Sequence, residues 1–480
     1  MLRALFSKSQ RFKRGSGSYL KWRTIFSFTK LQQQKQFPES NDILCTSEID
    51  DKDREYQELS SRFFGVEKAY NCYIIHPYIK WGPKKQILTT PEDQLEEAES
   101  LIRTLDPWTV EGKVVVPLTS LDKKTIFGSG NLEKLRNTIR SSKATAVFMN
   151  MSTLKIMQIE ELESQFGVPI FDRYKIVIEI LRLHAISKHA KLQVALAEIP
   201  YITNRLTQKD IACSNPEKRK LMLHSREQKL KAAIKKLRTQ HEMTRNRRKS
   251  LEFPSVAVVG YTNCGKTSLI KALSNDKDLQ PRNQLFATLD VTMHAGLLPS
   301  TLEVLYVDTV GFISDIPTTL IECFIATLED ALFATVILHV EDISSKKRKH
   351  QRNHVLQTLE NLLGKSLWKD KLNKIITVGN KCDLVEEIDN ESGLIPVSAK
   401  TGQGLDKLLK VLEDAVLKES NRRLLTIKIP FGGEEIRWLY KNATVKTEEE
   451  NPDDSQYENA TVIISEAKYH QFQKQFCNHR

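Results

Sequence analysis

The feature that most constrains the fold is a glycine-containing motif that lies between an apolar segment and a helix-forming segment. The run SVAVVGYTNCGKTSLIKAL (255–273) contains Gly260 and Gly265 in the pattern Gly-x-x-x-x-Gly-Lys-Thr. Glycines at these positions let backbone N–H groups turn toward phosphate oxygens, and the N-terminus of the following helix adds positive potential. The alternative is an ordinary glycine-containing turn, but the order strand, loop, helix is the context that phosphate binding requires. The sequence therefore predicts an α/β domain with a phosphate-binding loop.

The side chains of this loop predict a nucleotide bound together with a divalent cation. We expect Lys266 to reach the β- and γ-phosphates and the hydroxyl of Thr267 to bind Mg²⁺. The nucleotide-binding residues predicted in the loop are Gly260, Tyr261, Thr262, Asn263, Cys264, Gly265, Lys266, Thr267 and Ser268.

A second motif, DTVG, follows the strand-like segment EVLYVD (303–308). We expect Asp308 to hold Mg²⁺ through water and the N–H of Gly311 to contact the γ-phosphate.

A third ligand of Mg²⁺ is expected between these motifs, in LFATLDVTMHAGLL (285–298). Thr288 is the predicted residue and Thr292 is an alternative. A plain surface loop with some β-strand is the other interpretation of this segment. The predicted metal site thus consists of Thr267, Thr288 and Asp308.

Two further motifs predict that the nucleotide base is guanine. NKCD (380–383) follows the segment KIITVG, and its Asp383 can accept hydrogen bonds from guanine N1–H and the exocyclic amine, a pair that adenine lacks. Asn380 would tie this segment to the phosphate loop, and the stem of Lys381 would lie on the base. SAK follows LIPV and supplies Ser398, Ala399 and Lys400, of which Ala399 can donate its N–H to guanine O6.

Hydrolysis of GTP requires a positioned water and compensation of the phosphate charge. Phe312, directly after DTVG, supplies neither. Asn263 has two interpretations: it coordinates K⁺ beside the phosphates, or it only stabilises the loop. We expect slow intrinsic turnover that a partner stimulates by reshaping the switch loops, at about 283–296 and 309–325. The predicted catalytic residues are Lys266, Thr288, Gly311 and Asn263.

Upstream of the nucleotide motifs, strand and helix patterns alternate and predict a smaller α/β domain. Strands are predicted at 69–76, 114–118, 146–150 and 169–172, and helices near 91–105, 131–142 and 154–166.

A helical hairpin is predicted between the two α/β domains. Apolar residues at spacings of three and four predict one long helix over 173–206, and TQKDIACSNP (207–216) interrupts it. In the second helix Leu223, Leu230 and Leu237 are seven residues apart. Residues 217–250 carry thirteen Lys and Arg against three Glu. A solvated helix face is the simpler interpretation of such a run, but this excess favours an arm that binds a polyanion.

The N-terminal residues 1–38 contain nine Lys and Arg and no Asp or Glu, within a chain of net charge +12. This composition is typical of a mitochondrial transit peptide; a basic tail that binds nucleic acid is the alternative. The seven cysteines are scattered without a C-x-x-C pair, which suits a reducing compartment. No run of 18 apolar residues occurs in the sequence, so we expect no membrane insertion.

The predicted fold class is α/β: a P-loop GTPase domain, preceded by a smaller α/β domain with a long antiparallel helical hairpin and followed by a small α+β domain. The expected divisions are a transit peptide at 1–40, a linker at 41–65, an N-terminal α/β domain at 66–172, the basic hairpin at 173–250, the GTPase domain at 251–420 and a C-terminal α+β domain at 421–480.

The sequence resembles the HflX family of ribosome-associated GTPases, and within it the mitochondrial branch. The resemblance spans about residues 66–480. It is carried by GYTNCGKTSL, LFATLD, DTVGFISDIP and ILHVED in the GTPase domain, and by FGSGNLEKL (127–135), GVPIFDRYKIVIEIL (167–181) and AKLQVALAEIPYI (190–202) upstream.

This resemblance implies a protein that binds the large ribosomal subunit, splits ribosomes and hydrolyses GTP when stimulated by the ribosome. It also implies a role for the hairpin near the peptidyl-transferase centre. We also expect a monomer, and the composition of the N-terminal residues predicts the mitochondrial matrix. The sequence departs from the family in one respect, because the loop TQKDIACSNPEKRK lacks the glycines that the family commonly carries. A GTP-dependent switch for a protein or an anionic membrane surface is the alternative function.

Overall fold

The computed structural model describes residues 51–480 except for short internal gaps and the last residues. The gaps are 65–68, 81–88, 119, 121–123, 207–215, 251–252, 277, 282–283, 287, 290, 315–332, 373, 388–392, 453, 455 and 478–480. The expected transit peptide, most of the hairpin loop and parts of both switch loops therefore lie outside the described residues.

The chain divides into two compact units, 1–58 and 59–480. The expected linker at 41–65 contains helix α2 (Asp51–Phe63), so it is not wholly irregular. All the elements below belong to the second unit.

The first sheet has four parallel strands in the order β2-β1-β3-β4. Its strands are β1 (Asn71–Ile79), β2 (Thr109–Leu118), β3 (Ala146–Met149) and β4 (Ile170–Asp172), connected through α3 (Pro91–Thr104), α4 (Ser129–Ser141) and α5 (Ile156–Phe166). Helix α3 begins at a capping box, in which the Thr90 hydroxyl accepts the N–H of Asp93 at 3.1 Å and the Asp93 carboxylate accepts the N–H of Thr90 at 3.4 Å. Every strand and helix predicted for this domain is present within a few residues.

The prediction of one long helix over 173–206 is wrong. Two helices, α6 (Arg173–His184) and α7 (Lys188–Arg205), occupy this range. Residues 185–187 separate them, and the side chain of Ser187 caps α7 by accepting the N–H of Ala190 at 3.0 Å. No Gly or Pro lies at or near these residues, so no helix-breaking residue marks the break in the sequence.

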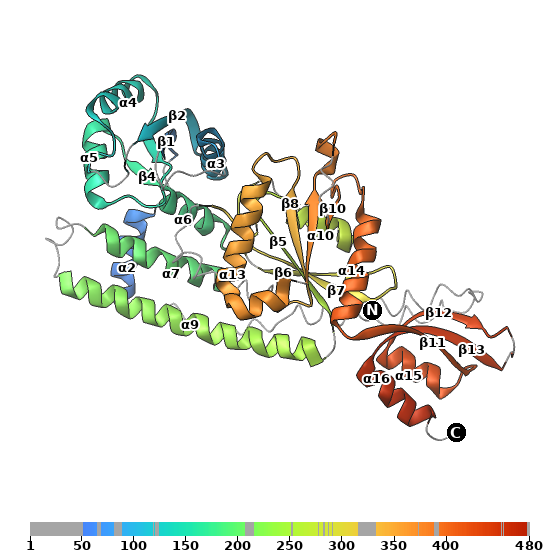
Figure 1. Cartoon of the computed structure of the whole chain (residues 1–480). Helices are drawn as coiled ribbons and strands as arrows, with labels where there is room; N and C mark the ends of the chain where they lie inside the picture. The colour runs from blue at the N-terminus through green and yellow to red at the C-terminus, as the bar shows by residue number, and fades with distance from the viewer. Residues whose placement is uncertain are drawn as a thin grey trace, which may run out of the picture. The chain divides into compact units, whose positions relative to one another are not determined.

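The hairpin consists of α7 and α9 (Pro216–Ser250), which pack against each other (Figure 1). Only ten residues connect the end of α7 to the start of α9. Because this connection is short, the two packed helices run in opposite directions. Leu223 and Leu230 of the predicted heptad are buried, and Leu237 is half-buried.

The second sheet has six strands in the order β10-β9-β8-β5-β7-β6. These are β5 (Ser255–Gly260), β6 (Thr292–Leu297), β7 (Glu303–Asp308), β8 (Val336–Asp342), β9 (Ile375–Asn380) and β10 (Leu394–Pro396), and α10 (Lys266–Ser274), α13 (Arg348–Leu372) and α14 (Leu405–Glu419) accompany them. All pairs are parallel except β6 with β7. Strand β5 lies between β7 and β8. The strands that follow β5 in sequence lie first on the β7 side and then on the β8 side, so the strand order reverses at β5. Doubly wound sheets bind their ligand at such a point.

The C-terminal domain is a three-stranded antiparallel sheet in the order β11-β13-β12. It comprises β11 (Arg422–Pro430), α15 (Glu434–Asn442), β12 (Thr444–Glu450), β13 (Tyr457–Ser465), α16 (Glu466–Phe472) and the π-helical turn η2 (Gln473–Cys477). Helix α15 was not predicted; its Ile436 and Leu439 pack in the core of this domain with Val462 and Phe472. The α+β composition is as expected. Across the residues described in all domains, every helix is too short or too polar to cross a bilayer.

Candidate nucleotide-binding site

The loop between β5 and α10 has two positions at which the structure leaves room only for glycine. Gly265 has φ 91°, and a Cβ there would lie 2.3 Å from Nδ2 of Asn380. A Cβ on Gly260 would lie 2.3 Å from the carbonyl oxygen of Val340. The two glycines therefore allow this loop to pass closely between its neighbours, and the first turn of α10 points its free N–H groups into the loop.

Lys266 lies inside the loop and not on its surface. The residue is 7% exposed, and its ammonium group donates to the carbonyl oxygen of Tyr261 at 2.9 Å. Gly311 lies directly against it, because a Cβ on Gly311 would be 3.1 Å from Nζ of Lys266. The structure thus brings together the lysine and the glycine that were predicted to contact the γ-phosphate.

Three oxygen-bearing side chains meet next to this lysine. The hydroxyl of Thr267 donates to Oδ2 of Asp308 at 2.6 Å, and the hydroxyl of Thr288 donates to the same oxygen at 3.2 Å. The two hydroxyl oxygens are 3.1 Å apart. Thr292 lies elsewhere: it pairs with Asp308 only across the β6–β7 ladder, and its exposed side chain contacts His294 at 2.9 Å. The geometry thus places Thr288, and not Thr292, at the predicted metal site.

These three residues fit a bound Mg²⁺. Asp308 is 1% exposed, and its Oδ1 has no hydrogen-bond partner among the described residues. Burial raises the pKa of Asp308, while the hydrogen bond from Thr267 and the charge of Lys266 oppose that shift. A buried carboxylate oxygen without a partner, beside two hydroxyls, is a site that a hard divalent cation stabilises. Mg²⁺ bound here would compensate the charge of the β- and γ-phosphates.

Phe312 has a backbone role. Its N–H donates to the carbonyl of Gly260 at 3.1 Å, and its carbonyl accepts the N–H of Thr262 at 2.7 Å, so the segment after Asp308 is paired with the phosphate loop. The side chain of Phe312 is buried. It therefore cannot orient a water, as the sequence predicted.

The predicted base-binding residues converge on the other side of the loop. Asn380 donates to the carbonyl of Cys264 at 2.9 Å and accepts the N–H of Ala399 at 3.1 Å, which ties NKCD and SAK to the phosphate loop. The Ser398 hydroxyl donates to Asp383 at 2.6 Å and lowers the pKa of that carboxyl. Asp383 is exposed, as is Lys400, so the carboxylate is open to a base.

Lys381 and Asn263 meet at the edge of this surface. The ammonium group of Lys381 donates to the carbonyl of Asn263 at 3.0 Å and to Asp342 at 2.6 Å. Asn263 has φ 60° and is exposed. Asp342, at the end of β8, was missed by the sequence reasoning, although its position in ILHVED directly after an apolar strand could have identified it.

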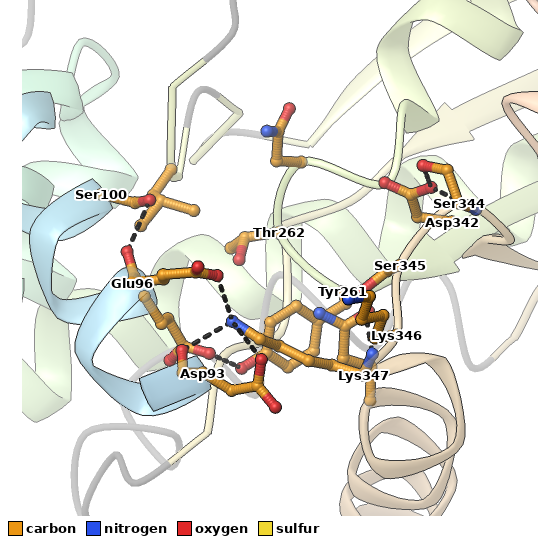
Figure 2. Close-up of a pocket in the computed structure, with 14 residues that line it drawn as sticks. Asp93, Glu96, Ser100, Tyr261, Thr262, Asp342, Ser344, Ser345, Lys346 and Lys347 are labelled. Carbon is orange, nitrogen blue, oxygen red and sulfur yellow. Dashed lines mark hydrogen bonds and ion pairs between the residues drawn. The ribbon is translucent and has the colours of Figure 1, made fainter. Parts of the chain in front are cut away.

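A pocket of about 350 Å³ opens beside the phosphate loop (Figure 2). Tyr261, Thr262 and Asn263 line it on the loop side, α3 lines it with acidic residues, and the segment 342–347 completes it. Lys347 crosses to α3 by donating to the carbonyl of Asp93 at 2.6 Å. This contact joins residues 254 apart in sequence, and no sequence pattern indicated it.

Two family models match the chain. One, described as the N-terminal domain of GTP-binding GTPases, matches residues 92–181; the other, described as a 50S ribosome-binding GTPase, matches residues 255–381. The GTP-binding protein 6 of Homo sapiens is 43% identical over 420 residues, covering 84% of this chain and 80% of that protein. The GTPase HflX of Caldanaerobacter subterraneus is 33% identical, covering 70% of this chain and 80% of that protein.

The chain belongs to the HflX family of GTPases. It is therefore a GTP-binding protein that hydrolyses GTP, and it is similar to the eukaryotic GTP-binding protein 6 proteins, which include one from Xenopus laevis at 40% identity over 86% of this chain and 81% of that protein. Among solved structures, the GTP-binding protein of Sulfolobus solfataricus in complex with GDP is 21% identical, with a TM-score of 0.37 over 72% of this chain and 99% of that one.

Proposed function

We propose that this HflX-family GTPase binds the large subunit of the mitochondrial ribosome and uses GTP to time its residence there, in ribosome dissociation or in late maturation of that subunit. The observation that carries the proposal is the two-sided character of helix α9. Helix α9 would bind ribosomal RNA. The GTPase domain would bind GTP through the residues around Asp383 and Lys266.

The inner side of α9 is apolar and the outer side is cationic. Met222, Leu223 and Leu230 are buried, so this side is already used for packing within the chain. The outer side carries the exposed lysines Lys218, Lys220, Lys229, Lys235 and Lys236. Like charges at helical spacing repel one another, and a phosphate backbone relieves that repulsion and releases counterions.

The match to a family model described as a 50S ribosome-binding GTPase supports this partner. A membrane surface is less suited to α9, because a helix that lies on lipid uses bulky aromatic residues opposite its charges. Residues 217–250 contain no Phe, Trp or Tyr.

Hydrolysis would use groups that contact the γ-phosphate and the metal ion together. The N–H of Gly311 and the ammonium of Lys266 would contact the γ-phosphate, and Thr288 would close the loop before β6 over the metal. Loss of the γ-phosphate removes these contacts and releases both switch loops. Because Phe312 is buried and cannot place a water, we propose slow intrinsic hydrolysis that the ribosome stimulates.

We also propose that Asn263 coordinates K⁺ beside the phosphates. Asn263 lies in the phosphate loop, its backbone is in the left-handed region at φ 60°, and the residue is exposed. The turnover of GTP in K⁺ and in Na⁺ tests this proposal: K⁺ should accelerate the native protein, and Asn263→Ala should remove the difference between the two cations.

Localisation to the mitochondrial matrix is proposed from the acid-free, basic residues 1–38. Residues 1–40 fused to a reporter should direct it to mitochondria and be removed there. A reporter that stays in the cytosol would contradict this part of the proposal.

The binding surface can be tested by charge reversal. Lys229, Lys235 and Lys236 are changed together to Glu, and co-sedimentation with purified mitochondrial large subunits is measured over a range of salt concentrations. The affinity should fall. The slope of log K against log salt concentration should also become smaller in magnitude by about two to three, which is roughly one for each phosphate that the variant no longer neutralises.

The matched control reverses three exposed lysines of α14, namely Lys407, Lys410 and Lys418, with the same change of net charge. This control should bind large subunits like the native protein. Equal losses for the two variants would mean that only net charge matters. Co-migration of the native protein with membranes instead of large subunits would contradict the proposal and favour the alternative partner.

A further inference from the structure

Tyr261 is one of the unspecified positions of the phosphate-loop motif, but three polar atoms surround its hydroxyl group. Oη lies 2.8 Å from Oε2 of Glu97, 2.8 Å from Oγ of Ser314 and 2.8 Å from the backbone nitrogen of Ser314. Glu97 belongs to α3, and Ser314 lies three residues after Gly311. The hydroxyl therefore joins the phosphate loop, the segment that follows DTVG and the N-terminal domain.

The directions of these hydrogen bonds follow from the donors present. The N–H of Ser314 can only donate, so Oη of Tyr261 accepts it. The carboxylate of Glu97 can only accept, so the single hydroxyl proton of Tyr261 goes to Glu97. The second lone pair of Oη is then free to accept from the Ser314 hydroxyl. Burial raises the pKa of Tyr261 well above its usual range, so this proton is present at neutral pH.

Arg173 holds the far side of this arrangement. Its side chain is 3% exposed and forms an ion pair with Glu97. The same guanidinium donates to the carbonyl of Ser314 at 3.0 Å and to Oδ1 of Asn150 at 3.0 Å. Both the N–H and the C=O of Ser314 are thus fixed by buried side chains, one from the phosphate loop and one from the first turn of α6.

We propose that the Tyr261 hydroxyl is a positioning group for GTP hydrolysis. By holding Ser314, it completes the pairing of Phe312 with the loop and fixes the segment 311–314 where the N–H of Gly311 faces the γ-phosphate. Glu97 and Arg173 act through Tyr261 and Ser314, and none of the four residues needs to touch the nucleotide through its side chain. The proposal rests on the GTPase activity and on the proposed contact of Gly311, and it is independent of the ribosomal partner.

If Tyr261 positions the N–H of Gly311, its loss should affect only nucleotides that carry a γ-phosphate. If it only supports the fold, its loss should affect GDP and GTP analogues equally. GDP binding uses the phosphate loop and the guanine-binding residues but not the N–H of Gly311. Loss of the Tyr261 hydroxyl should therefore weaken binding of GTP analogues and lower the hydrolysis rate, while binding of GDP changes little.

Tyr261→Phe removes only the hydroxyl, and Tyr306→Phe is its matched control. Tyr306 is a fully buried tyrosine of β7 whose hydroxyl has no hydrogen-bond partner within the part of the chain that the structure describes. For the full chain we measure kcat and KM for GTP, and the affinities for GDP and a non-hydrolysable GTP analogue. Tyr261→Phe should lower kcat and analogue affinity by about tenfold each, a combined effect of the size expected for a hydrogen bond to a charged group, with GDP affinity within about twofold. Tyr306→Phe should match the native protein.

The second test asks whether Glu97 acts through the tyrosine. Glu97→Ala alone should reproduce the kcat loss of Tyr261→Phe, and the double variant should be no more than about twofold slower than either single variant. Equal losses of GDP and GTP-analogue affinity in Tyr261→Phe would overturn the proposal in favour of a structural role. Native kcat in Tyr261→Phe would overturn it as well. An inactive native protein, in contrast, would count against the assigned GTPase activity itself.

Discussion

The hydroxyl oxygen of Thr288 lies 3.1 Å from that of Thr267, so the loop before β6 reaches the first turn of the helix that follows the phosphate loop. Both hydroxyls donate to the same oxygen of Asp308. Three residues far apart in sequence thus share one small polar site, and its second carboxylate oxygen has no partner among the residues that are described. This arrangement leads to the first prediction.

Thr288→Ala should impair the use of Mg²⁺, because it removes one of the two hydroxyls beside Asp308. We expect GTP hydrolysis at low Mg²⁺ to fall by at least about tenfold, the effect of removing one charge-assisted interaction, and higher Mg²⁺ to restore part of it. Hydrolysis measured across a Mg²⁺ titration checks this. Thr292→Ala is the control, since its exposed side chain contacts only His294 in the described structure, and a larger defect in this control would transfer the metal role to Thr292.

Asp383→Asn should change the base that the protein prefers. The amide can donate where the carboxylate accepts, which suits the exocyclic oxygen of xanthine and opposes the amine of guanine. We expect the affinity for GDP to fall by about 100-fold or more and the affinity for XDP to rise. Competition between the two nucleotides measures the switch, and an unchanged preference for guanine would remove Asp383 from the base site.

Gly265→Ala should abolish nucleotide binding, because the new methyl group would meet Nδ2 of Asn380 at 2.3 Å and push NKCD away from the loop. Gly393→Ala separates this effect from backbone strain. Gly393 has φ 90°, close to the φ of 91° at Gly265, but a Cβ there has no neighbour within 4 Å in the described part of the chain. Both variants should lose about 1 kcal/mol of stability from strain. Only Gly265→Ala should lose GDP affinity; equal loss in both would contradict the role of Asn380.

Glu179 should make the stability of the fold depend on pH. It is 1% exposed, and burial raises its pKa to about 7, against the opposing charges of Lys175 and Arg182. Between about pH 4.5, the ordinary pKa of a glutamate, and pH 7, the folded chain retains a proton that the unfolded chain has released. The free energy of unfolding should therefore fall as pH rises through this range and become level above it.

Glu179→Gln should flatten this pH dependence and stabilise the protein at about pH 8 relative to the native chain. Thermal or urea unfolding between about pH 5 and about pH 8 measures the effect. Glu160→Gln, at an exposed position of α5, is the control and should leave the slope unchanged. A slope that persists in Glu179→Gln would assign the proton to another group.

The sequence was sufficient for the nucleotide motifs and for the strands that precede them, because each motif directly follows an apolar strand, and parallel strands bring their carboxyl ends together. It was insufficient at 185–187, where the local hydrogen bond at Ser187 starts a new helix although no Gly or Pro marks the break. Helix α15 was missed because it is only nine residues long and lies between two strands, although its buried residues Ile436 and Leu439 are at helical spacing.

Contacts between residues that are far apart in the sequence could not be predicted either. Tyr261 and Glu97 are 164 positions apart, and Lys347 and Asp93 are 254 apart. No spacing rule connects such residues. By contrast, the choice between Thr288 and Thr292 was posed correctly by the sequence, and only the three-dimensional position of each hydroxyl separates them.

The most direct test of the account is the turnover of GTP by the mature protein with and without purified mitochondrial large ribosomal subunits. We predict that saturating subunits accelerate hydrolysis by at least about tenfold, and that the Lys266→Ala variant shows no acceleration because its phosphate loop lacks the ammonium group. Reversal of Lys229, Lys235 and Lys236 should raise the concentration of subunits needed for half-maximal stimulation. A GTP hydrolysis rate that stays the same at every subunit concentration, in a preparation that binds guanine nucleotide, would contradict the account.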